Sequence, residues 1–284
     1  MTTSSARDEQ LVITSRAGWL DVDLAGVWRY RNLFWLFVKR DIVLIYKQTV
    51  LGPLWFVIQP AVNALVFSII FGRLARLPTD GVPPFLFYLA GMVCWSYFST
   101  CLTLTAGTFN VYQGLFGKVY FPRLVVPLAT VVGNLVSFLV QLTMFLGFLA
   151  YFMWTGAAVG PTGYVLLLPL LLLEMAALSM GIGLIVAALT TRFRDLAMLL
   201  SYSISLGMYA TPIVYPFSLV PDAYKPLSLL NPMTGVVEMF RQGFLGTGEF
   251  TFGQYAFGLL LSAAILVCGV IVFSRFQKSF IDTI

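Results

Sequence analysis

The class of this protein is decided by residues 164–190, YVLLLPLLLLEMAALSMGIGLIVAALT, in which Glu174 is the one charged residue. A helix rises about 1.5 Å per residue, so a stretch of this length can cross the roughly 30 Å hydrocarbon core of a bilayer. Backbone groups that face lipid must be hydrogen-bonded within their own segment. The stretch is therefore predicted to be a membrane-spanning helix.

Five more apolar stretches occur on either side of it. They are residues 54–72, 85–106, 124–152, 196–215 and 252–274. Only 10% of the 284 residues are charged, whereas a soluble domain has about a quarter, and the mean hydropathy is +0.89. This composition excludes an ordinary soluble domain. The expected fold class is an all-α membrane protein with six transmembrane helices.

The basic residues predict which side of the membrane each loop occupies. Thirteen of the 17 Lys and Arg residues lie in the tails and loops on one side, and four lie on the other. Because basic residues are enriched on the cytoplasmic side, both termini are expected in the cytoplasm. The first twenty residues contain no apolar run typical of a cleaved signal peptide. We expect residues 1–26 to form a polar tail before one membrane domain, residues 27–284.

A shorter helix is expected before the first span, at residues 27–47. Its apolar stripe, at helical spacing, consists of Phe34, Val38, Ile42 and Ile45, and its opposite side contains Arg29, Arg40 and Lys47. A helix of this kind is predicted to lie in the cytoplasmic interface of the membrane. The alternative is a linker helix that is partly docked on the rest of the protein.

The cytoplasmic loop at residues 107–123, GTFNVYQGLFGKVYFPR, is short and basic but rich in aromatic residues. It is too small to be a domain and too apolar to be freely solvated. We expect it to contact a hydrophobic partner surface, and the alternative is that its aromatic residues insert into the membrane interface.

The outer loop at residues 216–251 contains the signals of a short helix. Asn231 before Pro232 is typical of a helix N-cap, and Gly246 is typical of a helix stop. About 14 residues cannot span a bilayer, so short re-entrant or interfacial helices are expected here. Glu238 and Arg241 are three residues apart on this helix and are predicted to pair.

Several kinds of chemistry are excluded. The chain has no histidine, which removes the usual general base and metal ligand, so no catalytic and no metal-binding residue is expected. No G-x-x-x-x-G-K-[ST] phosphate loop occurs, and GLFGKVY at residues 114–120 has the wrong spacing, so nucleotide hydrolysis by this chain is not expected. The spans contain no relay of charged residues, which argues against an ion-coupled transporter. Glu174 is expected to make a hydrogen bond between helices, with a functional ionisable group as the alternative.

Uncharged polar residues recur at helical spacing in two of the spans. They are Gln59 and Asn63 in the first span, and Ser201, Tyr202, Ser205 and Tyr209 in the fifth. Two interpretations remain open: hydrogen bonds between helices, or a hydrophilic path in which tyrosine rings stack on sugars. In the fourth span, Gly181 and Gly183 are predicted to allow close helix packing.

Five strings of the sequence occur in a familiar order. They are KRDIVLIYKQTVLGPLWFVIQP (39–60), GKVYFPR (117–123), TRFRD (191–195), TPIVYP (211–216) and LNPMTGVVEMFRQGFLG (230–246). Together they make the chain resemble the membrane-spanning subunits of ATP-binding-cassette exporters that move lipid-linked polysaccharides such as O antigens, capsules and teichoic acids. The resemblance covers nearly the whole chain after residue 27.

The resemblance implies a permease in the bacterial inner membrane that is itself not an enzyme. Two copies would pair around the pathway, and two separate nucleotide-binding ATPase subunits would hold ATP and Mg, leaving this chain without a cofactor. The other partners would be a lipid-linked glycan, O antigen first, and membrane lipids, but no nucleic acid. A permease for capsule, teichoic acid, a small lipid or a drug is the alternative.

The resemblance also suggests three groups of site residues. The ATPase-coupling residues would be Gly114, Leu115, Phe116, Lys118, Tyr120, Phe121 and Arg123, with Arg192 and Arg194 near the same face. Since spans one and five line the pathway in this family, we infer a substrate path at Gln59, Asn63, Tyr202, Tyr209 and Tyr215. Basic residues near a membrane surface attract anionic head groups, so Arg29, Lys39, Arg40 and Lys47 are expected at the entry of the lipid head.

Overall fold

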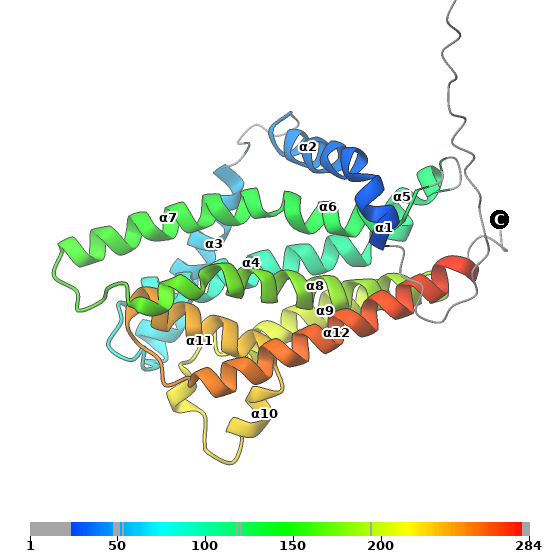
Figure 1. Ribbon diagram of the computed structural model, residues 1–284. Coiled ribbons are helices and arrows are strands. Elements are labelled where there is room, and N and C mark those ends of the chain that lie inside the picture. Colours follow the sequence, from blue (N-terminus) through cyan, green and yellow to red (C-terminus); the bar gives the residue numbers. More distant parts are fainter. Residues whose placement is uncertain are drawn as a thin grey trace, which may run out of the picture.

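The computed structural model describes residues 24–47, 52, 54–116, 119, 121–193 and 195–279, and all the regular elements in these residues are helices (Figure 1). The predicted helical class is confirmed for this part of the chain. The predicted polar tail, residues 1–26, falls almost entirely outside it.

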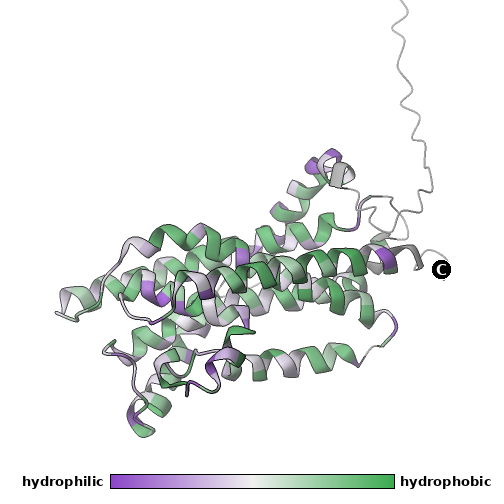
Figure 2. Ribbon diagram, turned by 60° about the horizontal axis from the view of Figure 1, so that its bottom comes forward, coloured by the Kyte–Doolittle hydropathy of each residue, from purple (hydrophilic) through white to green (hydrophobic). Residues whose placement is uncertain are grey.

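Five helical segments in the described residues are long and apolar enough to cross a bilayer. They are Leu54–Leu74, Pro84–Ala106, Val125–Trp154, Gly163–Thr190 and Phe252–Phe276. Each boundary lies within two residues of its prediction. In Figure 2 the hydrophobic colour follows these long helices, and hydrophilic residues gather toward their ends and in the connections. The bilayer therefore accounts for the length and composition of these segments.

The predicted span at 196–215 is shorter than expected. Helix α9 comprises Leu196–Ala210, only 15 residues, which rise about 22 Å instead of the roughly 30 Å of a bilayer core. Its outer end was predicted wrongly. Thr211 has extended backbone, with φ −95° and ψ 142°, because a residue that precedes a proline, here Pro212, avoids the helical region.

The other spans are built from the following helices. α3 (Leu54–Phe67) continues into a π-helical segment, η1 (Ser68–Leu74); α4 is Pro84–Ala106; α6 (Val125–Gly133) is followed by α7 (Leu135–Trp154); a 3-10 turn, η2 (Gly163–Leu167), precedes α8 (Leu168–Thr190); and α12 is Phe252–Ser279. Asn134 separates α6 from α7, and its side-chain amide donates to the carbonyl of Thr130. One predicted span is thus a pair of helices.

α4 is the central helix of the bundle. In its apolar window 78% of the residues are buried, against 11% in Leu54–Leu74. α4 packs against α3, α7, α8 and α9. The protein therefore has a well-packed centre, whereas α3 and α9 lie at its margin.

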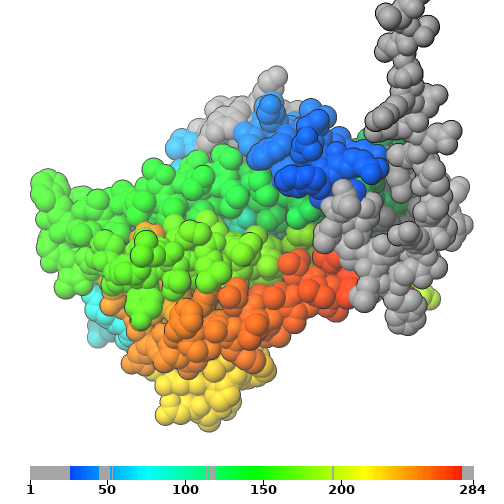
Figure 3. All heavy atoms as spheres, in the orientation of Figure 1, coloured from blue at the N-terminus to red at the C-terminus, as the bar shows by residue number. Residues whose placement is uncertain are grey.

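α8 and α12 pack side by side (Figure 3), and their backbones are in close contact. A Cβ atom on Gly181 would lie 2.7 Å from the Cα of Leu266 in α12, and one on Gly183 would lie 2.7 Å from Cβ of Thr105 in α4. Only glycine fits at such distances. The predicted close packing at Gly181 and Gly183 is confirmed.

The short elements gather at the two ends of the bundle. At one end lie α1 (Leu24–Arg29), α2 (Arg31–Lys47), α5 (Thr108–Phe116) and the C-terminal part of α12. Toward the other end lie η3 (Phe217–Leu219), α10 (Lys225–Leu229) and α11 (Pro232–Leu245) (Figure 1). This separation matches the predicted cytoplasmic and outer sides.

Candidate functional site

A second, smaller hydrophobic core lies at the predicted cytoplasmic end. It contains Phe37 and Val38 of α2 together with Phe121, Val125, Val126 and Ala129, and Phe34 and Ile42 pack at its margin. The predicted apolar stripe of α2 therefore packs against α6 and does not face lipid. The docked helix, which was the alternative, is what the structure shows. The side chains of Ile45 and Lys47 fall outside the described residues.

The opposite face of α1 and α2 is exposed and mixed in character. Trp28, Trp35, Leu36 and Val43 lie on it as large apolar side chains, and Arg29 and Lys39 are exposed with them. Tryptophan and basic side chains of this kind suit the head-group layer of a membrane. The helix thus has one face for the protein and another that fits the membrane interface.

Arg40 connects α2 to α5 and does not extend freely to a lipid head. Its guanidinium pairs with Asp41 at 2.6 Å, hydrogen-bonds to the hydroxyl of Tyr112, and lies over the rings of Phe37 and Tyr112 at 4.9 and 5.0 Å. Partial burial, the largest single influence, lowers the pKa of Arg40, but the hydrogen bonds and charge interactions with Asp41 and Tyr112 together outweigh it, so the net shift is upward. Partial burial raises the pKa of Tyr112. Arg40 is therefore a contact between α2 and α5, and its predicted role at a lipid head stays a prediction.

The predicted ATPase-coupling loop begins as helix α5, and several of its predicted contact residues are buried in the protein. Phe121 is 5% exposed and Arg123 is 8% exposed, and Leu115 packs on the small core. Of the predicted set, Gly114 is exposed. Phe121 and Arg123 are therefore buried in this structure, and their predicted coupling role stays a prediction. Lys118, Tyr120 and the side chain of Phe116 lie outside the described residues.

Other residues form the exposed surface at this end. Val111 is 73% exposed, Val119 is also exposed, and so is Phe193 in the loop between α8 and α9. The exposed guanidinium of Arg192 lies over the ring of Phe193 at 5.5 Å, and Arg194 lies outside the described residues. Neither Val111 nor Phe193 was among the predicted coupling residues. An exposed apolar residue beside a basic one is the signal that would have identified Phe193.

α5 also contacts the C-terminal part of α12, at the same end of the bundle. The ring of Phe109 stacks on Phe273 of α12, with 4.8 Å between centroids and an interplanar angle of 23°. Together with the contact between Arg40 and Tyr112, this stacking joins α5 to both α2 and α12. α5 therefore contacts two elements from distant parts of the chain.

The predicted pathway residues lie on two exposed helix faces. On α9, Tyr202 is 68% exposed and Tyr209 is 51% exposed. On α3, Gln59 is exposed and Asn63 is partly buried, and Tyr215 in the loop after α9 is also partly buried. Both helices pack on α4 by their other faces.

The serine residues of α9 make their hydrogen bonds within the helix. The hydroxyl of Ser201 donates to the carbonyl of Ala197 and that of Ser205 donates to the carbonyl of Ser201, at 3.2 and 3.1 Å. A hydrogen bond to a neighbouring helix is thus not what satisfies these two hydroxyls. The tyrosine rings beside them remain exposed.

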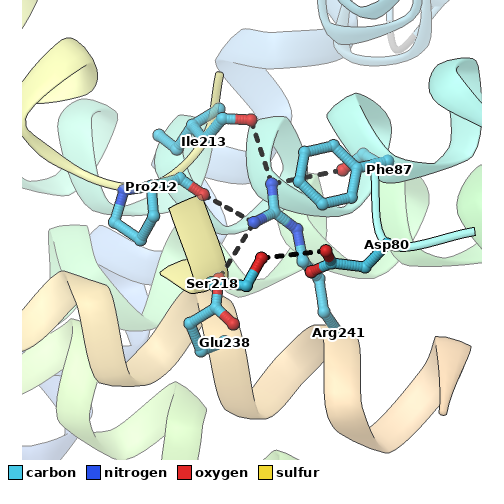
Figure 4. A network of polar contacts seen from close by, with 7 residues as sticks. All are labelled: Asp80, Phe87, Pro212, Ile213, Ser218, Glu238 and Arg241. Carbon is cyan, nitrogen blue, oxygen red and sulfur yellow. Dashed lines mark hydrogen bonds and ion pairs between the residues drawn. The ribbon is translucent and has the colours of Figure 1, made fainter. Parts of the chain in front are cut away.

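Polar contacts at the outer end centre on α11 (Figure 4). Asn231 caps the helix by accepting from the amide of Met233, Pro232 follows it, and Gly246 has φ +72°, so the predicted helix is confirmed. The predicted pair between Glu238 and Arg241 is confirmed at 3.1 Å.

Glu174 makes the helix-to-helix contact that was predicted for it. The hydroxyl of Ser262 in α12 donates to Oε1 of Glu174 in α8 at 3.3 Å. Glu174 is fully buried. The hydrogen bond adds a polar contact to the close packing of α8 and α12.

Comparisons with known proteins connect this architecture to a family. Residues 32–245 match the family described as ABC-2 type transporter. The chain is 31% identical over 218 residues to the O-antigen export system permease protein RfbA of Myxococcus xanthus, which covers 76% of this chain and 81% of the relative. It is 26% identical over 254 residues to the O-antigen export system permease protein RfbA of Klebsiella pneumoniae, covering 88% and 94%. It is 27% identical over 206 residues to the polysialic acid transport protein KpsM of Escherichia coli, covering 72% and 77%.

These matches agree with the chemistry of the chain, which lacks histidine and a phosphate loop. They also agree with the five long apolar helices among the described residues. The chain belongs to the ABC-2 type transporter family, as a membrane permease subunit that has no catalytic role of its own.

Proposed function

We propose that the protein is the permease of an ATP-driven exporter that moves lipid-linked polysaccharide, O antigen first, across the bacterial inner membrane. The observation on which this rests is the similarity to O-antigen export permeases, which extends over 76% of the chain at 31% identity. The exposed tyrosines of α9 support it, since tyrosine rings stack on sugars while their hydroxyls form hydrogen bonds. Capsule polysaccharide is the second candidate, because the relatives include a polysialic acid transport protein.

The topology that fits this function has six crossings with both termini in the cytoplasm. The distribution of basic residues supports two cytoplasmic ends, and two ends on one side require an even number of crossings. Among the residues that the structure describes, five segments are long enough to cross. α9 would be the sixth crossing, completed at its outer end by the buried residues 211–214.

A second copy of the chain and two ATPase subunits complete the proposed exporter. The exposed faces of α3 and α9 would line the pathway between the two copies, with Gln59, Asn63, Tyr202, Tyr209 and Tyr215 in its vicinity. ATP and Mg would bind to the ATPase subunits. α5, with Val111 at its surface, and the loop containing Phe193 would contact the ATPase, and the connection between Arg40 and Tyr112 would transmit its movement to α2.

The entry of the lipid head is proposed at the exposed face of α1 and α2. Arg29 of α1 and Lys39 of α2 are exposed there beside two tryptophans, so the diphosphate of a lipid-linked glycan would meet basic groups at head-group depth. Replacing both residues by glutamine is expected to lower export without lowering the amount of protein in the membrane. Unchanged export would remove the entry role.

The function is tested by deleting the gene and restoring it. Deletion is expected to remove O antigen from the cell surface and to leave lipid-linked glycan on the inner side of the membrane, where extraction and gel analysis detect it. Reintroducing the full chain should restore the surface polymer. Loss of capsule with O antigen intact would favour the second candidate, and loss of neither would refute the proposal.

The partnership with an ATPase is tested by co-purification from membranes. The tagged chain should retain an ATPase whose turnover rises in the complex. Export of glycan by the reconstituted chain alone, without any ATPase, would contradict the proposed mechanism.

A further inference from the structure

α9 is held loosely along its length but firmly just beyond its outer end. None of its 15 residues is buried, and its contacts are made by partly buried residues such as Leu200 and Ile204 and by Gly207, which lies against the ring of Trp95. Residues 211–214, which follow directly, are all buried. The fixed part of this segment is therefore the bend that follows the helix, residues 211–214.

Arg241 of α11 binds this bend through main-chain oxygens (Figure 4). Its Nη1 donates to the carbonyl of Pro212 at 2.5 Å, and its Nη2 donates to the carbonyl of Ile213 at 2.9 Å. Nη2 also donates to the carbonyl of Phe87 in α4 at 3.4 Å, and the guanidinium lies 3.6 Å from the centroid of the Phe87 ring. One side chain thus joins α11, α4 and the bend.

The surroundings of Arg241 keep it in this position. The residue is 1% exposed, and Glu238 pairs with it one helical turn away. A buried charge needs a partner and hydrogen bonds, and both are present here. The planar guanidinium presents several donors at fixed angles, which a lysine ammonium cannot do.

The start of α11 provides a second contact to the same bend. The side-chain amide of Asn231 donates to Oγ1 of Thr211 at 2.8 Å, and that hydroxyl donates to the carbonyl of Gly207 at 2.8 Å. α11 itself is buried along nearly its whole length. It therefore forms a rigid base to which the outer end of α9 is attached at two points.

We propose that Arg241 is a positioning residue of the transport cycle, which fixes residues 211–213 so that α9 swings about this point when the ATPase binds nucleotide. The inference rests on the proposed function, because the ATPase drives the movement. At about 1.5 Å of rise per residue, Met198 lies roughly six times as far from Thr211 as Tyr209 does. Displacement at Met198 is expected to exceed that at Tyr209 by the same factor.

Spin-label distances in the full complex with its ATPase, reconstituted in lipid, measure these displacements. Cys268 on α12 is a natural exposed cysteine and provides the reference label, because α12 packs tightly on α8. The second label is placed by Met198→Cys or by Tyr209→Cys, both at exposed positions. Labelled chains are diluted with unlabelled Cys268→Ser chains so that only distances within one copy are measured, without nucleotide and with ATP under conditions that block hydrolysis.

In the unmodified background the distance should change several-fold more at position 198 than at position 209. Arg241→Lys retains the charge but loses the planar set of donors. It should bring the distance change at position 209 close to that at position 198. Thr211→Val removes one contact of the bend and leaves Arg241 in place, so it should give a smaller effect of the same kind. Arg73→Gln changes an exposed arginine in η1 and is the matched control.

Equal changes at both positions in the unmodified background would overturn the pivot while leaving ATP-driven movement intact. If the ratio of the distance change at position 198 to that at position 209 is the same in Arg241→Lys and in Thr211→Val as in the unmodified background, the role of Arg241 is overturned. Absence of any nucleotide-dependent change in the assembled complex would overturn both the pivot and the function on which it rests.

Discussion

The contact between α8 and α12 predicts a measurable loss of stability on adding a single methyl group. A Cβ atom on Gly269 of α12 would lie 2.9 Å from the Cα of Gly181 in α8, and closer still to its carbonyl oxygen. Carbon atoms in good contact are about 3.5–4.0 Å apart, so Gly269→Ala would force the helices apart by roughly 1 Å. The clashing atoms belong to the backbone and cannot move to another rotamer.

The expected size of the effect follows from two opposing terms. Overpacking costs about 1–3 kcal/mol, and a clash with backbone belongs in the upper half of that range. Alanine also favours the helix over glycine by about 1 kcal/mol. Gly147→Ala in α7 is the matched control, because nothing lies within 4 Å of its Cβ position and the helix term is the same. The difference between the two variants isolates the clash, at about 2–3 kcal/mol.

Thermal unfolding of the purified protein in one detergent measures this difference. On a scale of about 2–4 °C per kcal/mol, Gly269→Ala should unfold roughly 4–12 °C below Gly147→Ala. Adding Gly181→Ala to Gly269→Ala should cost less than the sum of the two single changes, since one separation of the helices relieves both clashes. Equal midpoints for Gly269→Ala and Gly147→Ala would refute the close backbone contact.

Three further changes test other parts of the structure. Tyr112→Phe removes the hydrogen bond to Arg40, a contact worth about 1.5–3 kcal/mol. It should lower the amount of glycan exported per ATP hydrolysed several-fold while the complex still assembles. An unchanged ratio of export to ATP hydrolysis in paired assays would contradict a coupling role for this contact. Val111→Asp adds a charge to the exposed surface of α5 and should reduce ATPase recovery in co-purification, whereas full recovery would place the docking surface elsewhere. Glu174→Gln keeps an acceptor for Ser262 and should retain near-normal export, so loss of export by a folded Glu174→Gln variant would reveal an ionisable role.

The spans could be predicted from the sequence because the bilayer imposes both their length and their composition. Stretches such as residues 85–106 contain no charged residue, and the helices end within two residues of the predicted limits. The cap of α11 at Asn231 was predictable for a local reason, since the signal and the structure it produces are adjacent in the chain. The early end of α9 was also signalled locally, by Pro212, but the apolar residues around it concealed the signal.

The coupling surface could be predicted only in part. Val111 and Phe121 are both apolar and belong to the same loop, yet Val111 is exposed and Phe121 is buried. In a segment that is apolar on several sides, hydrophobicity does not indicate which side packs. The position of α2 on α6 decides which residues are covered, and it also places Arg40 beside Tyr112.

Four features could be predicted from the residues alone: the helical class, the approximate limits of five spans, the cap of α11 and the pairing of Glu238 with Arg241. Each of these depends on composition or on residues within about one helical turn of each other. The covered faces of α2, α3 and α9, and the atoms that Arg241 binds, depend instead on how distant segments pack together. Those atoms are carbonyl oxygens from distant parts of the chain, and every residue has such an oxygen, so no residue type in the sequence marks them in advance.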